Sequence, residues 1–360
     1  MIRPKHTPLR IGGIGCGPMS VNTHYPAIQQ NPELELVAVC DLDEERLNAA
    51  TRKFHLKQKY SDFIQMLDEC ELDAVSIVGP PSLHVLAGQE CQRRQIPFMT
   101  EKPLAESVAE ARELARLAEK LGNCGQVGYT IRFGPAIRMG WEISRSPKFG
   151  KITYVATSHL IKATMRPTWN KADPVEAFVN LHGVHAIDLW RFFGGDPDRV
   201  TTHVVYGDAN EKSPQASILV FVEKEDGPHG IIHMKAGASH SGDINADIMG
   251  VESRLRIEDL QTITYEHSQD WASEIIENDL LKNSISVEHL PVGQYINAGQ
   301  MARNYDDYFK LEWAAFARAI LDGRPFSPTI EDGFRTVCLT EAICQSLHQG
   351  GKSVLVNYDK

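Results

Sequence analysis

A glycine-rich turn near the N-terminus is the feature that most constrains the fold of this chain. Residues 9–14 form a short apolar run typical of a buried strand, and residues 15–20 (GCGPMS) follow it at once. This order matches the first two glycines of G-x-G-x-x-G, with a serine at the third position. Gly15 permits a tight turn, and Gly17 lets the backbone approach a pyrophosphate that the N-terminus of the next helix stabilises. The pattern predicts a dinucleotide site, although an ordinary strand-to-helix turn can carry it too.

A second apolar run, residues 36–40, ends in Asp41. In a dinucleotide-binding fold an acid at this position hydrogen-bonds the adenine ribose hydroxyls. Three of the next four residues are acidic, and no lysine or arginine precedes Arg46. Such an edge repels a 2′-phosphate, and we expect no nearby cation to compensate, so the sequence favours NAD over NADP. The competing interpretation is that Asp41 or Asp43 only caps the following helix; Asp43 can cap it while Asp41 binds ribose.

The rest of the first third alternates between helical and strand-like segments, with a Gly79-Pro80-Pro81 turn among them. We expect helices at residues 62–70, 82–94 and 107–121, and strands at residues 74–78, 96–100 and 124–128. This alternation is typical of a doubly wound parallel sheet. The sequence therefore predicts an N-terminal Rossmann dinucleotide-binding domain over residues 1–128.

The tripeptide Glu101-Lys102-Pro103 follows the last of the longer strands. Ligands of open parallel sheets bind at the carboxyl ends of the strands, so a lysine held there can hydrogen-bond a substrate hydroxyl beside a nicotinamide. The competing interpretation is a surface salt bridge between Lys102 and Glu101. The strand-end position and Pro103 argue against a freely mobile lysine.

Beyond Tyr129 the pattern changes, and we expect residues 129–360 to form an α+β domain with an open, mainly antiparallel sheet. We expect strands at residues 152–160, 199–206, 216–222, 230–236 and 254–257, and helices near residues 135–145, 184–193, 306–321 and 331–347. Residues 268–300 are polar and aperiodic, which predicts a long loop with a short helix near residues 271–281.

Composition argues against several classes of protein. Lys and Arg total 37 and Asp and Glu total 47, which gives a formal net charge of −10. No basic patch or polybasic segment appears, so we expect neither a nucleic-acid nor a membrane partner. No apolar run approaches the roughly 20 residues that a membrane helix needs. The seven cysteines form no C-x-x-C pair, as expected of free thiols in a soluble cytoplasmic protein.

These motifs, in this order, resemble the glucose-fructose oxidoreductase, inositol dehydrogenase and rhizopine catabolism (Gfo/Idh/MocA) family. The resemblance is carried by Gly15-x-Gly17, Asp41, Pro81-x-x-His84, Glu101-Lys102-Pro103, Tyr129-x-x-Arg132-Phe133, residues 183–188 (GVHAID) and Gly323-Arg324-Pro325. It implies NAD- or NADP-dependent oxidation or reduction of a hydroxyl on a sugar, cyclitol or sugar derivative. It also implies a homodimer or homotetramer formed through the outer face of the second sheet.

The resemblance also assigns roles to individual residues. Lys102 and His185 carry over as the pair that lines the substrate pocket, with His185 as the acid/base. We expect cofactor contacts from Gly15, Gly17, Pro18, Met19, Asp41, Gly79, Pro80, His84, Glu101 and Lys102. We expect substrate contacts from Tyr129, Arg132, His159, Trp169, Asn180, His182 and His185.

The histidine motif departs from the family pattern. The family has D-x-x-x-H, but Leu181 stands four residues before His185, with Asn180 beside it and His182 next. On a helix His182 and His185 share a face, so His182 can supply a second polar contact. A changed substrate is one meaning of this departure, and lost activity is another.

Several alternatives stay open at this point. His185 can be a satisfied core histidine on an apolar face. The pair His182-x-x-His185 lacks an acidic or cysteine partner at helical spacing, so we expect no metal. Besides a dehydrogenase, the chain can be an enzyme that cleaves a glycoside by transient oxidation and elimination, or a nucleotide-binding regulator without activity.

Overall fold

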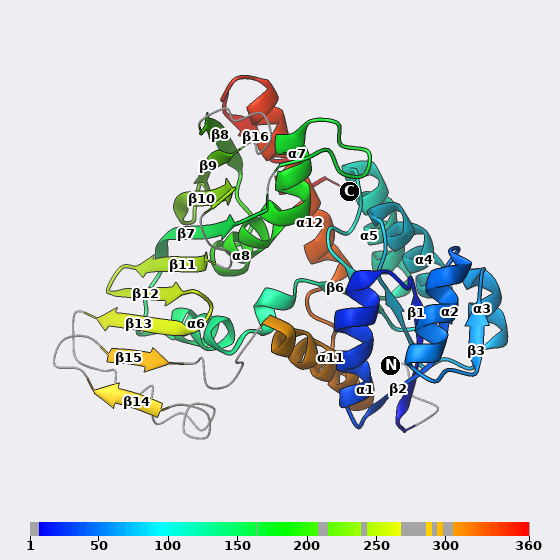
Figure 1. Ribbon diagram of the computed structural model, residues 1–360. Helices are drawn as coiled ribbons and strands as arrows, with labels where there is room; N and C mark the ends of the chain where they lie inside the picture. The colour runs from blue at the N-terminus through cyan, green and yellow to red at the C-terminus, as the bar shows by residue number, and fades with distance from the viewer. Residues whose placement is uncertain are drawn as a thin grey trace. The chain divides into compact units, whose positions relative to one another are not determined.

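The computed structural model describes residues 7–163, 165–207, 215–238, 243–267, 286–289, 294–297 and 305–359 (Figure 1). The chain forms two compact units. The first contains Met1–Thr130 and Tyr305–Val337, and the second contains Ile131–Asn304 and Cys338–Asp359. The first boundary falls two residues from the expected one, whereas a late segment of the chain returns to the first unit.

The first unit is built on six parallel strands in the order β3-β2-β1-β4-β5-β6. Their bounds are β1 Leu9–Ile14, β2 Leu34–Cys40, β3 Gln58–Tyr60, β4 Ala74–Ile77, β5 Phe98–Glu101 and β6 Gly125–Gly128. Every residue of β4 and β5 is buried, as expected of central strands covered on both faces. Strand β3 was not predicted, because a three-residue polar edge strand has no apolar periodicity.

Helices connect these strands and follow the expected segments. Their bounds are α1 Tyr25–Gln30, α2 Glu44–Lys53, α3 Phe63–Glu69, α4 Pro81–Arg94 and α5 Val108–Leu121, and a π-helical turn, η1 Ser20–His24, precedes α1. Asp43 caps α2, and Ser107 caps α5 in a capping box with Glu110. Late in the chain, α11 (Tyr305–Asp322) packs against α1 in the same unit, and α12 (Ile330–His348) begins there.

The second unit contains a ten-stranded sheet in the order β14-β15-β13-β12-β11-β7-β10-β9-β8-β16 (Figure 1). Its strands are β7 Ile152–Ile161, β8 Arg199–Tyr206, β9 Ala216–Glu223, β10 His229–Ala236, β11 Asp243–Gly250, β12 Ser253–Glu258, β13 Thr262–His267, β14 Ser286–His289, β15 Gln294–Asn297 and β16 Val354–Leu355. Only the pair of β7 and β10 is parallel among the paired strands described. The fold is therefore the expected Rossmann sheet followed by an open, mainly antiparallel sheet.

Buried and more exposed residues alternate along these strands, so one face of the sheet is buried and the other is partly exposed. The other elements of this unit are α6 Pro135–Arg145, the 3-10 turn η2 Thr130–Phe133 at its start, α7 Pro174–Phe178, the π-helical turn η3 Val179–Gly183 and α8 Val184–Gly194. Trp190 donates from Nε1 to the Val155 carbonyl at 2.9 Å, which fixes α8 on the buried face of β7.

Two expectations about this unit need correction. The segment 268–300 is not one long loop, because β14 and β15 lie within it; their polar sequences hide them from a periodicity search. Strands β11 and β13 were missed as well. The short helix expected near residues 271–281 lies outside the described residues. All seven cysteines are buried and free, and none of the described helices is long and apolar enough to cross a membrane.

Candidate active site

The glycine turn follows β1, and its two glycines differ in their surroundings. Gly15 has φ +100°, and a Cβ there would lie 1.9 Å from the Val78 carbonyl oxygen, so only glycine fits. A Cβ on Gly17 would meet no atom within 4 Å. Gly17 therefore leaves an open approach to the backbone, as a dinucleotide pyrophosphate requires. Pro18 and Met19 begin the helical segment after it and are exposed.

Asp41 ties the turn to the end of β2. Its Oδ2 accepts a hydrogen bond from Cys16 N at 2.7 Å, and its Oδ1 accepts one from Asp43 N at 2.8 Å. A carboxylate has about four acceptor sites, so the two oxygens keep capacity for ribose hydroxyls. Arg46 Nη2 lies 3.9 Å from Asp41 Oδ1. The expectation that no cation stands near Asp41 was therefore wrong, because the first turn of α2 brings Arg46 back toward it.

His84 joins the loops that follow β4 and β5. Gly79 N donates to His84 Nε2 at 3.4 Å, and His84 Nδ1 lies 2.8 Å from the Pro103 carbonyl oxygen. Since Nε2 accepts, Nδ1 carries the proton and donates to Pro103. Burial lowers the pKa of His84, which keeps the ring neutral in this arrangement. Gly79 and Pro80 lie at the same end of the sheet, where Pro80 caps α4.

Glu101, at the end of β5, is held by a chain of buried hydrogen bonds. Trp313 Nε1 donates to His24 Nδ1 at 3.2 Å, and His24 Nε2 lies 3.0 Å from Glu101 Oε1. Glu101 Oε2 accepts from Lys102 N at 2.9 Å. Burial would raise the pKa of Glu101, but the His24 hydrogen bond and the His24 and Lys102 charges outweigh it and lower that pKa. The carboxylate thus fixes the backbone at Lys102.

Lys102 follows β5 directly, and the Lys102–Pro103 peptide is cis. Burial lowers the pKa of Lys102, and the Glu101 charge only partly offsets this. A second acid, Glu312 of α11, is fully buried. Burial and the Glu101 charge raise the pKa of Glu312 well above its usual range, which favours the protonated form of this carboxyl.

In the second unit three histidines gather where α8 packs on β7. His185 is 8% exposed, and its ring centroid lies 5.5 Å from that of His159. His159 Nδ1 lies 2.9 Å from the His182 carbonyl oxygen. His182 belongs to the π-helical turn η3. The prediction that His182 and His185 share one face assumed a regular α-helix. The structure thus brings His159, His182 and His185 together.

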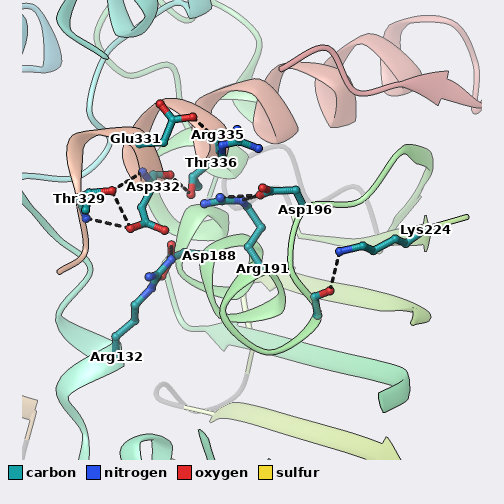
Figure 2. Close-up of polar contacts among 11 residues, drawn as sticks. Arg132, Asp188, Arg191, Asp196, Lys224, Thr329, Glu331, Asp332, Arg335 and Thr336 are labelled. Carbon is teal, nitrogen blue, oxygen red and sulfur yellow. Dashed lines mark hydrogen bonds and ion pairs between the residues drawn. The ribbon is translucent and has the colours of Figure 1, made fainter. Parts of the chain in front are cut away.

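Arg132 forms a buried pair with Asp188 of α8 (Figure 2). Arg132 Nε donates to Asp188 Oδ2 at 2.7 Å, and Nη2 donates to Oδ1 at 2.6 Å. The guanidinium also lies 5.0 Å from the centroid of the Phe192 ring. These contacts anchor Arg132 against α8, and the sugar contact expected for it stays a prediction.

The other residues expected to contact the substrate lie in different parts of the structure. Asn180 Nδ2 donates to the Glu176 carbonyl at 2.9 Å, within its own helical segment. Tyr129 is 1% exposed and belongs to the first unit. Trp169 is 39% exposed and has φ +50° in the turn between Thr168 and Lys171. Among the residues described, no group of three or more His, Cys, Asp or Glu could hold a metal ion.

Sequence reasoning missed His24, Trp313 and Glu312. His24 lies seven residues beyond Gly17, in a stretch that reads only as the first helix, and 289 positions separate it from Trp313. No local pattern connects residues so far apart. Only the return of α11 to the first unit brings them together.

Comparisons with known proteins identify the two parts of the chain. Residues 9–129 match the family model "Oxidoreductase family, NAD-binding Rossmann fold", and residues 145–356 match "Oxidoreductase family, C-terminal alpha/beta domain". The D-apiose dehydrogenase of Paraburkholderia graminis is 29% identical over 192 residues, which cover 52% of this chain and 50% of that protein. Inositol 2-dehydrogenase 2 of Saccharopolyspora erythraea is 24% identical over 95% of this chain and 94% of its own.

Solved structures share the fold across nearly the whole chain. The WlbA dehydrogenase from Bordetella pertussis, in complex with NADH and UDP-GlcNAcA, has a TM-score of 0.79 at 18% identity and covers 99% of both chains. Levoglucosan dehydrogenase, in complex with NADH and levoglucosan, has a TM-score of 0.78 at 18% identity and covers 98% of this chain and all of its own. With both family models matched, the chain belongs to the Gfo/Idh/MocA family of oxidoreductases and carries its NAD-binding Rossmann domain.

Proposed function

We propose that this protein transfers hydride between NAD and a hydroxyl or keto carbon of a sugar, a cyclitol or a sugar derivative. One observation carries the proposal. The glycine turn, Asp41 and Lys102 follow the carboxyl ends of β1, β2 and β5 in a single parallel sheet. Ligands of such sheets bind at this edge. The named relatives that are sugar and inositol dehydrogenases support the same class of substrate.

The chain supplies two groups suited to alcohol oxidation. NAD provides the hydride acceptor. Lys102 is placed by the Glu101 hydrogen bond to its backbone, and its ammonium stabilises negative charge that develops on the substrate oxygen. His185 has a side chain whose ordinary pKa suits transfer of the hydroxyl proton near neutral pH. We assign Lys102 to binding the oxygen and His185 to moving its proton.

The cofactor preference follows from Asp41. Its carboxylate has acceptor capacity for the two ribose hydroxyls and repels a 2′-phosphate. Arg46 stands close enough to soften that repulsion, so NADP binds more weakly but measurably. We propose NAD as the working cofactor.

We also propose a homodimer or homotetramer formed through the second sheet. Phe221 is 45% exposed and pairs in register with Ile231, which pairs in turn with Ala156. These three side chains form an apolar row across the partly exposed face of the sheet. A second copy of the chain would cover such a row. The seven buried free thiols fit a reducing cytoplasm.

A panel of sugars, cyclitols and glycosides with NAD tests the function. The absorbance of reduced nicotinamide should rise in proportion to product. Cofactor that stays bound while a glycoside is cleaved would instead identify the oxidation and elimination reaction. Tight NAD binding with no turnover of any member of the panel would point to a regulator.

A further inference from the structure

A small pocket in the second unit lies next to the histidine cluster. It has a volume of about 260 Å³ and is lined by Ala163, Arg166, Thr168, Ala177, Phe178, Leu181 and His182. Its floor is apolar, since Ala177 and Phe178 are buried and Leu181 carries no charge. Polar groups reach it from Arg166, Thr168 and His182. The lining therefore combines apolar surface with polar groups that can orient a small polar ligand.

The loop that carries Arg166 is fixed at both ends. Gly237 N donates to the Ala163 carbonyl at 3.0 Å, just before Arg166. Just after it, Thr168 and Lys171 exchange two backbone hydrogen bonds of 3.2 and 3.1 Å. The Thr168 hydroxyl donates to the Arg166 carbonyl at 3.2 Å. Backbone hydrogen bonds thus lie on both sides of Arg166 in the sequence.

Arg166 brings a positive charge to this pocket. The structure records no ion pair for Arg166 with any residue it describes. The nearby acids have other partners. Asp173 Oδ1 accepts from Val175 N at 2.7 Å, and Glu176 Oε1 lies 2.6 Å from Lys171 Nζ. Arg166 is an exposed residue that lines this pocket, and its planar guanidinium matches the two oxygens of a carboxylate or a phosphate.

We propose that this pocket is an oxyanion subsite and that the substrate is an acidic monosaccharide, with its anionic group on Arg166. The proposal rests on the proposed function, since it names the substrate class of that same site. The volume of about 260 Å³ lies below the range of about 300–1,000 Å³ common for drug-sized ligands, which fits one sugar ring or its acid group. His182 lines the pocket and also bonds His159 through its backbone, which connects the subsite to His185.

Matched pairs of sugars test the proposal directly. Glucuronate and glucose, and galacturonate and galactose, are titrated by calorimetry into the NAD-loaded protein; glucose 6-phosphate is the phosphate probe. We expect at least one anionic sugar to bind 10-fold or more tightly than its neutral partner. Whichever binds more tightly, the sugar acids or glucose 6-phosphate, shows whether the subsite prefers a carboxylate or a phosphate. Equal affinities within every pair, or no binding by any anionic sugar, overturn the proposal.

Variants of Arg166 test whether its charge causes the preference for anionic sugars. Arg166→Gln should weaken the anionic sugar by about 10- to 100-fold, the range of a charge-assisted hydrogen bond, and leave the neutral sugar unchanged. The affinity of Arg166→Lys for the anionic sugar should lie between those of the parent protein and Arg166→Gln, since lysine keeps the charge but lacks the planar guanidinium. The control is Lys162→Ala, which removes an exposed neighbouring cation that does not line the pocket. An unchanged acid-to-neutral ratio in Arg166→Gln refutes the subsite.

The same samples separate this proposal from the function on which it rests. Reduced nicotinamide is read by absorbance after each titration. Selective binding of the acid without any reduced nicotinamide supports the subsite and counts against hydride transfer to that sugar. Turnover of neutral and acidic partners at equal rates and affinities supports the dehydrogenase and refutes the subsite.

Discussion

His24 Nε2 lies 3.0 Å from Glu101 Oε1 inside the first unit. Because the other ring nitrogen accepts from Trp313 Nε1, the proton of a neutral His24 sits on Nε2 and is donated to Glu101. Glu101 then accepts from Lys102 N on its second oxygen. The backbone of the lysine at the strand end is thus held through Glu101 by a residue of η1 and a residue of α11.

Removing this hydrogen bond should destabilise the fold at neutral pH. His24→Phe keeps the ring volume but leaves a buried carboxylate without its donor, so the free energy of unfolding should fall by about 1.5–3 kcal/mol. The pKa of Glu101 is lowered from 4.5, so its stabilisation is present above pH 4.5 and is lost as the pH falls through the lowered pKa. The loss in His24→Phe should shrink in acid. Urea unfolding from pH 3 to pH 7 measures it, and His24→Gln, which keeps a donor, should lose less.

The Arg132 and Asp188 pair should behave as a buried ion pair (Figure 2). Asp188→Asn leaves a buried guanidinium without its counter-charge, which should cost about 3–5 kcal/mol of unfolding free energy. The double variant Arg132→Met, Asp188→Leu should lose less than the sum of the single changes, because no charge then remains buried. Denaturant titration of the four proteins gives the coupling energy.

An exposed pair of the same type provides the control. Arg256 Nη2 lies 3.0 Å from Glu266 Oε1, with both side chains at least 36% exposed. Glu266→Gln should change the unfolding free energy by about 0–1 kcal/mol. A comparable small loss in Asp188→Asn would show that Arg132 does not depend on Asp188.

Glu312 should make the protein less stable as the pH rises. Its pKa is raised in the folded state by burial and by the Glu101 charge, whereas the unfolded chain releases this proton near pH 4.5. The folded state then binds more protons, so stability falls with pH by about 1.4 kcal/mol per unit above pH 4.5 until the raised pKa is reached. Glu312→Gln removes this slope and should stabilise the protein at pH 8.

Thermal unfolding at pH 5, 6, 7 and 8 checks the sign. The Tm difference between Glu312→Gln and the parent protein should grow from pH 5 to pH 8. The matched control is Glu113→Gln, an exposed glutamate of α5, whose Tm difference should stay constant. A constant difference for Glu312→Gln would mean that Glu312 is already ionised in the fold.

The sequence predicted those parts of the fold whose signals are local. Gly15 and Asp41 each stand directly after an apolar run, so the strand, turn and acid could be read in order. Lys102 could be placed because it follows β5. The hydrogen-bond chain from Trp313 to Glu101 could not be read, since it joins residues 289 positions apart and depends on where α11 packs. The pairing of Arg132 with Asp188 could not be read either, because an ion pair between residues 56 positions apart leaves no local pattern in the sequence.

The cofactor preference can be resolved by changing Arg46. Calorimetry should show NAD binding more tightly than NADP in the parent protein, because Asp41 accepts ribose hydroxyls and repels phosphate. Arg46→Ala should weaken NADP further and leave NAD nearly unchanged, since Arg46 Nη2 lies 3.9 Å from Asp41 Oδ1. Asp41→Ala should weaken NAD by about 1.5–3 kcal/mol for each charge-assisted bond lost. NADP that binds as tightly as NAD in the parent protein would refute the preference.

Lys102 and His185 are the residues that we expect to carry the reaction. Lys102→Ala and His185→Ala should each lower kcat by about 10²- to 10⁴-fold, the range for loss of charge stabilisation and of acid/base catalysis. NAD affinity should stay nearly intact, because neither residue needs to contact the pyrophosphate or the adenine ribose. Steady-state kinetics and calorimetric NAD titration measure the two effects separately.

The double variant tests whether the two residues serve one substrate oxygen. Groups that act as a unit are not additive, so its loss in kcat should be smaller than the product of the single losses. Losses that multiply would mean independent roles. Near-normal turnover in His185→Ala would move the proton transfer to another group, and His182 and His159 are the next variants to test because both lie in the same cluster. If the kcat of His185→Ala instead rises with pH, the result supports His185 as the base, since hydroxide can then replace the missing imidazole.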